Sequence, residues 1–244
     1  MTASVLRALH HDRAPGDPLV LPGPWDAASA RVFAGAGFPA LATPSAGIAA
    51  SLGYEDGATP AAEMFAAVAR IVRAVPAHVP VSADIEGGYG LAPKELVERV
   101  LDTGAVGCNL EDSVDGTLVD ARRQADRLAE VRAVAGDRLF VNARVDTYVH
   151  GVPEGTDQEA ETVRRALLYV AAGADCVYPI AAPPESLPRL AAAVPAPLNA
   201  LARPDGPSPR ELGALGATRI TFGPGLQRRA MAAVRGIADE LRKA

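Results

Sequence analysis

Short apolar segments alternate with longer amphipathic segments along almost the whole chain, and this alternation limits the fold more than any other feature. The apolar segments predict strands at residues 19–23, 40–45, 79–86, 106–112, 138–146, 176–180, 197–201 and 219–224. Each is followed by a predicted helix, at residues 25–36, 60–74, 93–104, 117–135, 157–173, 185–193, 208–215 and 225–242. Eight strand–helix pairs are typical of the (β/α)₈ or TIM barrel. We therefore expect an α/β fold in which residues 1–244 form one TIM-barrel domain.

The alternative fold is an open, doubly wound parallel sheet. The junctions DTGAVG, AAGADC and ALGATR each pass from a helix through glycine and alanine into a strand, as a repeated unit would. No GxGxxG sequence opens the first predicted helix, so the chain lacks the fingerprint of dinucleotide-binding sheets. A barrel of 244 residues is of ordinary size for a single domain.

Composition excludes several classes of partner. The formal net charge is −5 and charges of both signs are interspersed, so no basic stripe predicts nucleic-acid binding. No apolar run approaches the length of a membrane span, and the first residues lack the apolar core of a signal peptide. Cys108 and Cys176 lie in apolar segments without zinc-site spacing, which favours reduced thiols. We expect a cytoplasmic protein without a membrane or nucleic-acid partner.

Acidic side chains follow two predicted strands where a barrel has its active site. Asp84 and Glu86 end the third strand, Glu111 ends the fourth, and Arg144 ends the fifth. Residues two apart point to the same face of a strand, so these side chains would meet at the mouth. Crowded carboxylates require a counter-charge, and Mg²⁺ prefers oxygen ligands. Asp84, Glu86 and Glu111 are therefore the predicted metal-site residues, the alternative being solvated surface turns.

A second group of candidates lies in the stretch TPSAGIAASLGYEDG after the second strand. Thr43, Ser45, Ala46 and Gly47 could present hydroxyl and backbone N–H groups to an anion, although a flexible loop would have the same composition. Further along, Asn142 precedes Arg144 on the fifth strand. Other side chains that follow strands and could line the mouth are Tyr54, Tyr89, Tyr148, His150 and Arg203.

Several segments, in their order and spacing, resemble the isocitrate lyase/phosphoenolpyruvate mutase family. They are LPGPWDAASARVFAGAGFPALATPSAGIAASLGYEDG, VSADIEGGYG, GAVGCNLEDS and FVNARVDTY. The resemblance implies an α/β barrel that depends on Mg²⁺, with Mn²⁺ as a second possibility. It implies chemistry that makes or breaks C–C or P–C bonds next to a 2-oxo acid through a metal-bound enolate. It also implies a homo-oligomer, either a dimer or a tetramer.

The same resemblance assigns roles to residues. Asp84 resembles the direct metal ligand, and Glu86 and Glu111 resemble acids that hold metal-bound waters, Glu111 being a catalytic residue as well. Arg144 resembles the catalytic arginine that binds the substrate carboxylate or oxyanion. Asp56 matches an acid near the reacting group. The predicted substrate-binding residues are Thr43, Ser45, Ala46, Gly47, Asn142 and Arg144.

One loop departs from the family. The loop SVDGTLVDARRQ after the fourth strand lacks the Lys-Lys/Arg-Cys-Gly-His motif of the lyases and the lysine and asparagine of the phosphonate mutases. The second acid of the metal motif is Glu86, where aspartate is common.

The resemblance and the assigned residue roles together predict a Mg²⁺-dependent lyase that cleaves a C–C bond in, or decarboxylates, a small 2-oxo or 2-hydroxy carboxylic acid. The alternatives are a phosphonopyruvate-type P–C mutase or hydrolase, and a non-catalytic homologue that binds metal and oxo acid.

Overall fold

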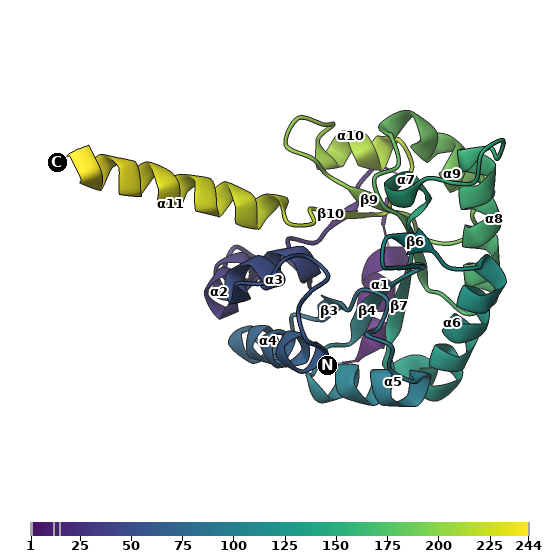
Figure 1. Cartoon of the computed structure of the whole chain (residues 1–244), viewed down its shortest axis with the longest axis horizontal. Helices are drawn as coiled ribbons and strands as arrows, with labels where there is room; N and C mark the ends of the chain where they lie inside the picture. The colour runs from purple at the N-terminus through teal and green to yellow at the C-terminus, as the bar shows by residue number, and fades with distance from the viewer. Residues whose placement is uncertain (1, 12, 15, 244) are drawn as a thin grey trace.

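The computed structural model describes residues 2–11, 13–14 and 16–243. Within them, eight parallel strands form the wall of a barrel (Figure 1). They are β1 (Leu19–Val20), β2 (Leu41–Ala42), β3 (Val81–Asp84), β4 (Gly107–Glu111), β7 (Phe140–Val145), β8 (Cys176–Pro179), β9 (Asn199–Leu201) and β10 (Arg219–Thr221). All eight predicted strands are confirmed, although each is shorter than predicted.

Two groups of strands close into the barrel. Five pair in the order β2-β3-β4-β7-β8 and three in the order β1-β10-β9. One seam is joined by Ala42 N, which donates to Pro22 O at 3.2 Å, and the other by a bridge between Val177 and Leu198. The TIM barrel is therefore confirmed over the open sheet.

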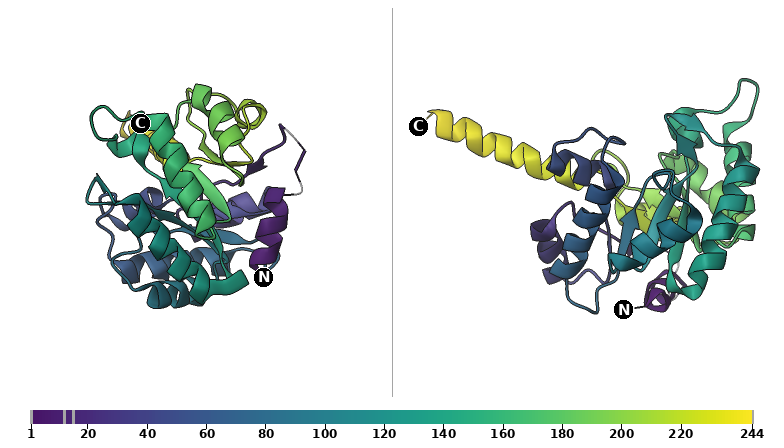
Figure 2. Two further views of the ribbon diagram at one scale, coloured as in Figure 1. Left: turned by 90° about the vertical axis from the view of Figure 1, so that its right-hand side faces the viewer. Right: turned by 60° about the horizontal axis from the view of Figure 1, so that its bottom comes forward.

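Seven of the predicted helices pack around the strands (Figures 1 and 2). They are α2 (Ala27–Gly35), α4 (Ala61–Ala74), α5 (Pro93–Asp102), α6 (Ala121–Ala135), α8 (Gln158–Ala171), α9 (Leu187–Ala193) and α10 (Pro209–Ala214), with short 3₁₀ turns at η1 (Gly136–Arg138) and η2 (Pro184–Ser186). Each buries one stripe of its surface; in α5 the stripe is Leu96, Val97 and Val100. Ser208 and Glu211 form a capping box at α10, where Glu211 N donates to Ser208 Oγ at 3.3 Å.

An unpredicted helix, α1 (Ala3–His11), covers the amino-terminal end of the barrel. Its Leu6 is fully buried, and Gly107 makes room for it, because a Cβ at Gly107 would lie 2.8 Å from Leu6 Cδ2. His10 stacks on Phe140 with ring centroids 4.3 Å apart. The barrel therefore has a closed floor, and its other end carries the site.

Three further elements lie where loops or a longer helix were expected. The stretch predicted as a loop after β2 contains a helix, α3 (Ser45–Leu52). The loop after β4 folds into a hairpin of β5 (Ser113–Val114) and β6 (Thr117–Leu118), so α6 begins four residues later than predicted. A short helix, α7 (Thr147–His150), follows β7.

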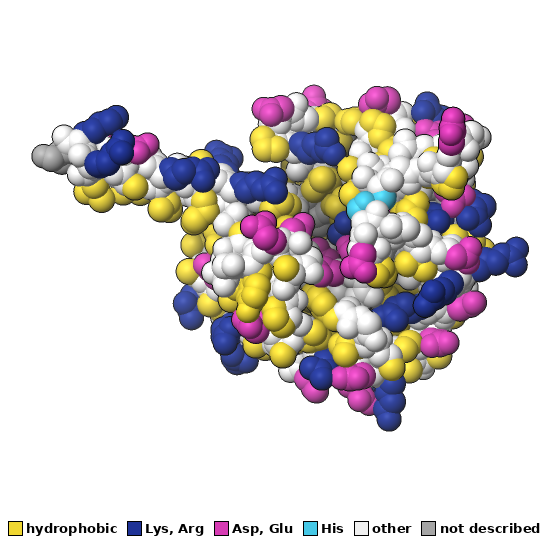
Figure 3. Space-filling view, viewed as in Figure 1, with side chains coloured by type: hydrophobic (Ala, Val, Ile, Leu, Met, Phe, Trp, Pro, Cys, Tyr) yellow, Lys and Arg dark blue, Asp and Glu magenta, His cyan; other side chains and the backbone are white. Residues whose placement is uncertain are grey.

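The last helix, α11 (Gly225–Lys243), points away from the barrel instead of packing along it (Figures 1 and 2). Its Val234, Ile237 and Leu241 are 52%, 56% and 74% exposed. Hydrophobic side chains line one side of this projecting helix and basic side chains the other (Figure 3). No helix among the described residues is long and apolar enough to cross a membrane.

Candidate active site

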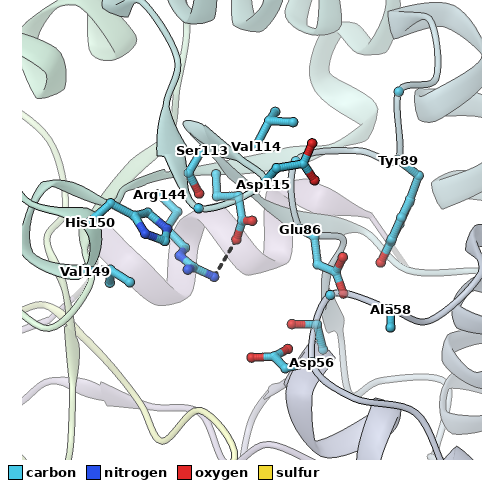
Figure 4. Close-up of a pocket in the computed structure, with 16 residues that line it drawn as sticks. Asp56, Ala58, Glu86, Tyr89, Ser113, Val114, Asp115, Arg144, Val149 and His150 are labelled. Carbon is cyan, nitrogen blue, oxygen red and sulfur yellow. Dashed lines mark ion pairs between the residues drawn. The ribbon is translucent and has the colours of Figure 1, made fainter.

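Two adjoining cavities open at the carboxyl ends of the strands, where acidic side chains surround a hollow (Figures 3 and 4). The outer cavity has a volume of about 660 Å³ and the inner one about 270 Å³. Glu86, Tyr89, Glu111, Ser113, Asp115 and His150 line only the outer cavity. Thr43, Ala46, Asp84, Asn109, Tyr178 and Ile180 line only the inner cavity. Ser45, Asp56, Arg144 and Val149 border both and join the two.

Asp84 stands at the end of β3, directly in front of the amino terminus of α3. Its Oδ2 accepts hydrogen bonds from Ser45 Oγ at 3.0 Å and from Ser45 N at 3.4 Å. Its backbone N donates to Thr43 Oγ1 at 3.1 Å. A helix amino terminus favours negative charge because its first N–H groups lack partners within the helix. The predicted anion-binding segment is therefore the start of a helix, and its N–H and hydroxyl groups hold Asp84.

Arg144 crosses the mouth from β7 and is held by two acids. Its Nη1 lies 2.5 Å from Glu111 Oε2 on the neighbouring strand. Its Nε and Nη2 donate to the two oxygens of Asp146 at 2.6 and 3.0 Å. Burial opposes the charge of Arg144, but Asp146 and Glu111 raise its pKa above the ordinary value. The guanidinium is thus fixed with one edge against Asp146. Its other side is directed toward the acids of the cavity (Figure 4).

A buried polar network lies behind Arg144 and joins Asp146 to Asp112. Fully buried Asp146 accepts from Ser113 Oγ at 2.6 Å and donates its backbone N to Asp112 at 2.8 Å. Asp112 in turn accepts from Arg165 Nη1 at 2.9 Å and Tyr169 Oη at 2.7 Å. Asp146 stands two residues after Arg144, so the alternation of side chains places it on the same face as Arg144. Arg165 and Tyr169 lie on α8, and no local signal links them to the mouth.

Three acids of the mouth have a raised pKa. Burial, followed by the charges of Asp84 and Asp56, raises the pKa of Glu86 from 4.5 to about 7. Burial raises the pKa of Glu111 from 4.5 to about 8, although Arg144 opposes the shift. Partial burial and Asp84 also raise the pKa of Asp56. Without a cation, Glu86 and Glu111 resist full ionisation at neutral pH.

These shifts predict how stability depends on pH in metal-free protein. Between pH 4.5 and about 8, folded Glu111 holds a proton that the unfolded chain releases, so the free energy of unfolding falls as pH rises. Glu111→Gln, which stays neutral, should lose about 3–4 kcal/mol less than wild type between pH 5 and pH 8. Urea unfolding in EDTA at both pH values measures the difference. Equal losses in the two proteins would contradict the raised pKa.

The residues of the mouth fit a magnesium ion with few protein ligands. Within the described residues, no group of three or more Asp, Glu, His or Cys side chains is close enough to ligate one ion. Asp84, Glu86 and Glu111 are therefore not three direct ligands in this arrangement. Glu86 Oε1 is buried and has no hydrogen-bond partner in the described structure, so it can still accept from a water. Mg²⁺ usually keeps several waters and takes one or two carboxylates, which suits Asp84 as ligand with Glu86 and Glu111 bound through water.

The remaining predicted residues divide between the cavities and the barrel interior. Asp56, Thr43 and Ala46 border the inner cavity. Gly47 lines neither cavity; a Cβ there would lie 2.8 Å from Pro44 Cγ, so this glycine allows close packing instead. Asn142 is fully buried beneath the mouth, where its Nδ2 donates to Asn109 Oδ1 at 2.8 Å. In this structure Gly47 and Asn142 therefore line neither cavity, and their predicted part in substrate binding stays a prediction.

The loop after β4, whose sequence departs from the family that the chain resembles, is a hairpin in the structure. Asp115 and Gly116 form its turn with φ values of 48° and 74°, as the Asp-Gly pair favours. Ser113, Val114 and Asp115 border the outer cavity. Neighbouring Cys108 is 1% exposed within the core, and burial raises its pKa to about 12. No thiol of the described chain therefore lines either cavity.

Comparison with known proteins agrees with the barrel and its polar mouth. The family model for phosphoenolpyruvate phosphomutase matches residues 6–242. An uncharacterised protein of Mycobacterium tuberculosis H37Rv is 38% identical over 216 residues, covering 88% of this chain and 80% of that protein.

Two solved enzymes share the whole fold. Oxaloacetate acetylhydrolase, solved with the inhibitor 3,3-difluorooxalacetate, is 26% identical with a TM-score of 0.87, covering 98% of this chain and 86% of the other. 2,3-Dimethylmalate lyase is 28% identical with a TM-score of 0.84, covering 100% and 88%. The match over residues 6–242 and this shared fold lead to one conclusion: the chain belongs to the phosphoenolpyruvate phosphomutase family, within the isocitrate lyase/phosphoenolpyruvate mutase superfamily.

Proposed function

We propose that the protein is a Mg²⁺-dependent lyase that cleaves a C–C bond in, or decarboxylates, a small 2-oxo or 2-hydroxy carboxylic acid. The observation that carries this proposal is the inner cavity of about 270 Å³, which Arg144, Asp84 and Ser45 line together. Cavities for drug-sized ligands are commonly about 300–1,000 Å³, so this one suits a molecule of a few carbon atoms. Its charges suit a carboxylate beside a cation.

In this proposal some residues of the inner cavity bind the substrate, and others balance the charge or exclude water. A substrate carboxylate replaces Glu111 as the partner of Arg144 Nη1, while Asp146 keeps the guanidinium in place. Asp84 would hold Mg²⁺, which when bound would supply positive charge to neutralise the acids and to stabilise negative charge developing on the substrate. Tyr178 and Ile180 border the inner cavity and exclude water from the reacting carbon atoms.

The relatives support carbon chemistry as well as phosphonate chemistry. Oxaloacetate acetylhydrolase and 2,3-dimethylmalate lyase are named for substrates that are small acids, whereas the family model is named for a phosphomutase. Among the lining residues of both cavities there is no lysine and only one asparagine, the interior Asn109. A phosphonyl group carries more negative charge than a carboxylate and needs more cationic partners than Arg144 alone. The lining therefore favours the C–C reaction.

The test is a turnover screen with Mg²⁺ of 2-oxo, 2-hydroxy and phosphono acids, with pyruvate, glyoxylate and oxalate release as readouts. Metal-dependent release from a 2-oxo or 2-hydroxy acid would support the proposal. Turnover of phosphonopyruvate alone would select the P–C reaction. Tight oxalate binding without any turnover would select a non-catalytic binding protein.

We further propose that the protein is a homo-oligomer in which α11 packs against a second copy of the chain. Nineteen helical residues extend over about 28 Å. Val234, Ile237 and Leu241 share one face of this helix, because they are spaced three and four residues apart. An exposed apolar face on a projecting helix is stabilised when another surface covers it.

Ile237→Lys tests this arrangement by placing a charge in the middle of the apolar face. We expect the variant to lose subunits, shifting the mass measured by light scattering after gel filtration toward that of a single chain of 25.1 kDa. Val32→Lys is the matched control. Like Ile237, Val32 is an exposed β-branched apolar residue, 68% accessible, but it lies on α2. Wild-type protein that is monomeric, or an Ile237→Lys variant of unchanged mass, would contradict the proposal.

A further inference from the structure

The loop between β3 and α5 holds two side chains in an unusual backbone conformation. Glu86 and Tyr89 have φ values of 51° and 55°, in the left-handed region that side chains other than glycine seldom adopt. Glu86 is the second residue of a tight turn in which Gly88 N donates to Ile85 O at 2.9 Å. Tyr89 is the second residue of the next turn, in which Leu91 N donates to Gly88 O at 3.0 Å. Such conformations cluster at functional sites because the surrounding structure has to enforce them.

Contacts from two helices fix this loop. Arg127 on α6 donates through Nη2 to Gly87 O at 3.3 Å and Leu91 O at 3.2 Å. The ring of Tyr89 packs edge-on against Phe65 of α4, with centroids 5.9 Å apart and planes at 74°. The positions of the Glu86 and Tyr89 side chains are therefore set by packing as well as by the turns.

Both side chains bring an unpaired polar atom to the outer cavity. Tyr89 Oη and Glu86 Oε1 are buried, and neither has a hydrogen-bond partner within the described structure. Both residues line the outer cavity, where the Tyr89 hydroxyl lies on the side of the Glu86 carboxylate (Figure 4). A phenol donates and a carboxylate oxygen accepts. Buried polar atoms generally have partners, so this pair needs a group that accepts from one and donates to the other.

We propose that Tyr89 Oη and Glu86 Oε1 together bind one hydroxylic oxygen in the outer cavity. The oxygen belongs to a substrate hydroxyl or to a water, since both accept one hydrogen bond and donate another. Binding of a substrate hydroxyl rests on the proposed function, in which Arg144 and Asp84 hold the carboxylate end of the substrate in the inner cavity. Tyr89 then touches the part of the substrate that extends outward, and it selects acids that carry a hydroxyl there.

Tyr89→Phe removes the phenol oxygen and keeps the ring against Phe65, so folding should be preserved. Calorimetry with Mg²⁺ compares two probes: oxalate, which has no hydroxyl group, and malate, which has one. We expect the variant to bind malate about 10-fold more weakly and oxalate as well as wild type does. Tyr54→Phe is the matched control, since the Tyr54 hydroxyl donates to Glu63 outside the cavities. The control should change neither affinity.

Crystal structures of wild type and Tyr89→Phe with Mg²⁺ and oxalate decide whether the bound oxygen belongs to a substrate hydroxyl or to a water. If both affinities are unchanged, a water between Tyr89 Oη and Glu86 Oε1 that is present in wild type and absent in the variant would identify the oxygen as water. Unchanged affinities with no oxygen atom at that position would overturn the inference. Wild-type protein that binds neither acid would count against the proposed function alone, because the bridging water can still be sought in the unliganded crystal.

Discussion

Replacing Asp84 with asparagine is expected to abolish turnover, with kcat falling by at least about 1,000-fold, equivalent to about 4 kcal/mol. The variant keeps the shape of the side chain and its contact with Ser45 Oγ, so the barrel should fold normally. It removes the negative charge at the one acid of the inner cavity that faces a helix amino terminus. Titration calorimetry should show weaker Mg²⁺ binding in the same variant.

Asp126→Asn is the matched control for this change. Asp126 is exposed on α6 and lines neither cavity, so the same loss of charge should change kcat by less than about twofold. Mg²⁺-dependent turnover at the wild-type rate in Asp84→Asn would contradict the assignment of the metal to β3. A variant that binds Mg²⁺ normally but is inactive would instead make Asp84 a substrate contact.

Replacing Arg144 with lysine should reduce kcat/KM by about 100- to 1,000-fold, equivalent to about 3–4 kcal/mol. Lysine keeps the charge but cannot contact Asp146 with two nitrogens and Glu111 with a third, as Arg144 does. One or both acids then lose a partner in a buried setting. We expect most of the effect in KM for the substrate, because the lost group binds a carboxylate.

Arg123→Lys provides the control, since Arg123 is exposed on α6 and lines neither cavity. Oxalate binding by calorimetry separates recognition from chemistry: Arg144→Lys should weaken it in parallel with the rise in KM. Unaltered oxalate affinity in a variant with low kcat would assign Arg144 to a later step than binding.

The sequence predicted the strands well because a barrel strand is read from a short local pattern. Segments such as VPVSADIE and RLFVNARVD are apolar, bounded by turn residues, and too short for buried helices. The same local reading failed for α3, since TPSAGIAASL consists of small residues that also suit a loop. It missed α1 as well, whose apolar stripe depends on the barrel floor and on the missing side chain of Gly107.

The site residues, like the helices and strands, were predicted where a local pattern was sufficient and missed where distant contacts decide their position. Asp84, Glu111 and Arg144 could be identified because their strand positions place them at the mouth once the barrel is assumed. Asn142, two residues before Arg144, shares its face of β7 but lies deeper, where its side chain donates to Asn109, and the sequence did not indicate this depth. Parity is fixed by the alternation of side chains, whereas height depends on register with neighbouring strands.

The sequence by itself therefore determined the barrel, the polar mouth at the carboxyl ends of its strands, and the acids and arginine that meet there. Only the tertiary structure decided which partner each of these groups has. Ser45 reaches Asp84 across 39 positions, and Tyr169 reaches Asp112 across 57. Tyr89 and Glu86 face one cavity because Arg127 and Phe65, from distant helices, fix their loop. Periodicity is a local property of the chain, but hydrogen-bond partners, burial and pKa values arise from contacts that only the closed barrel brings together.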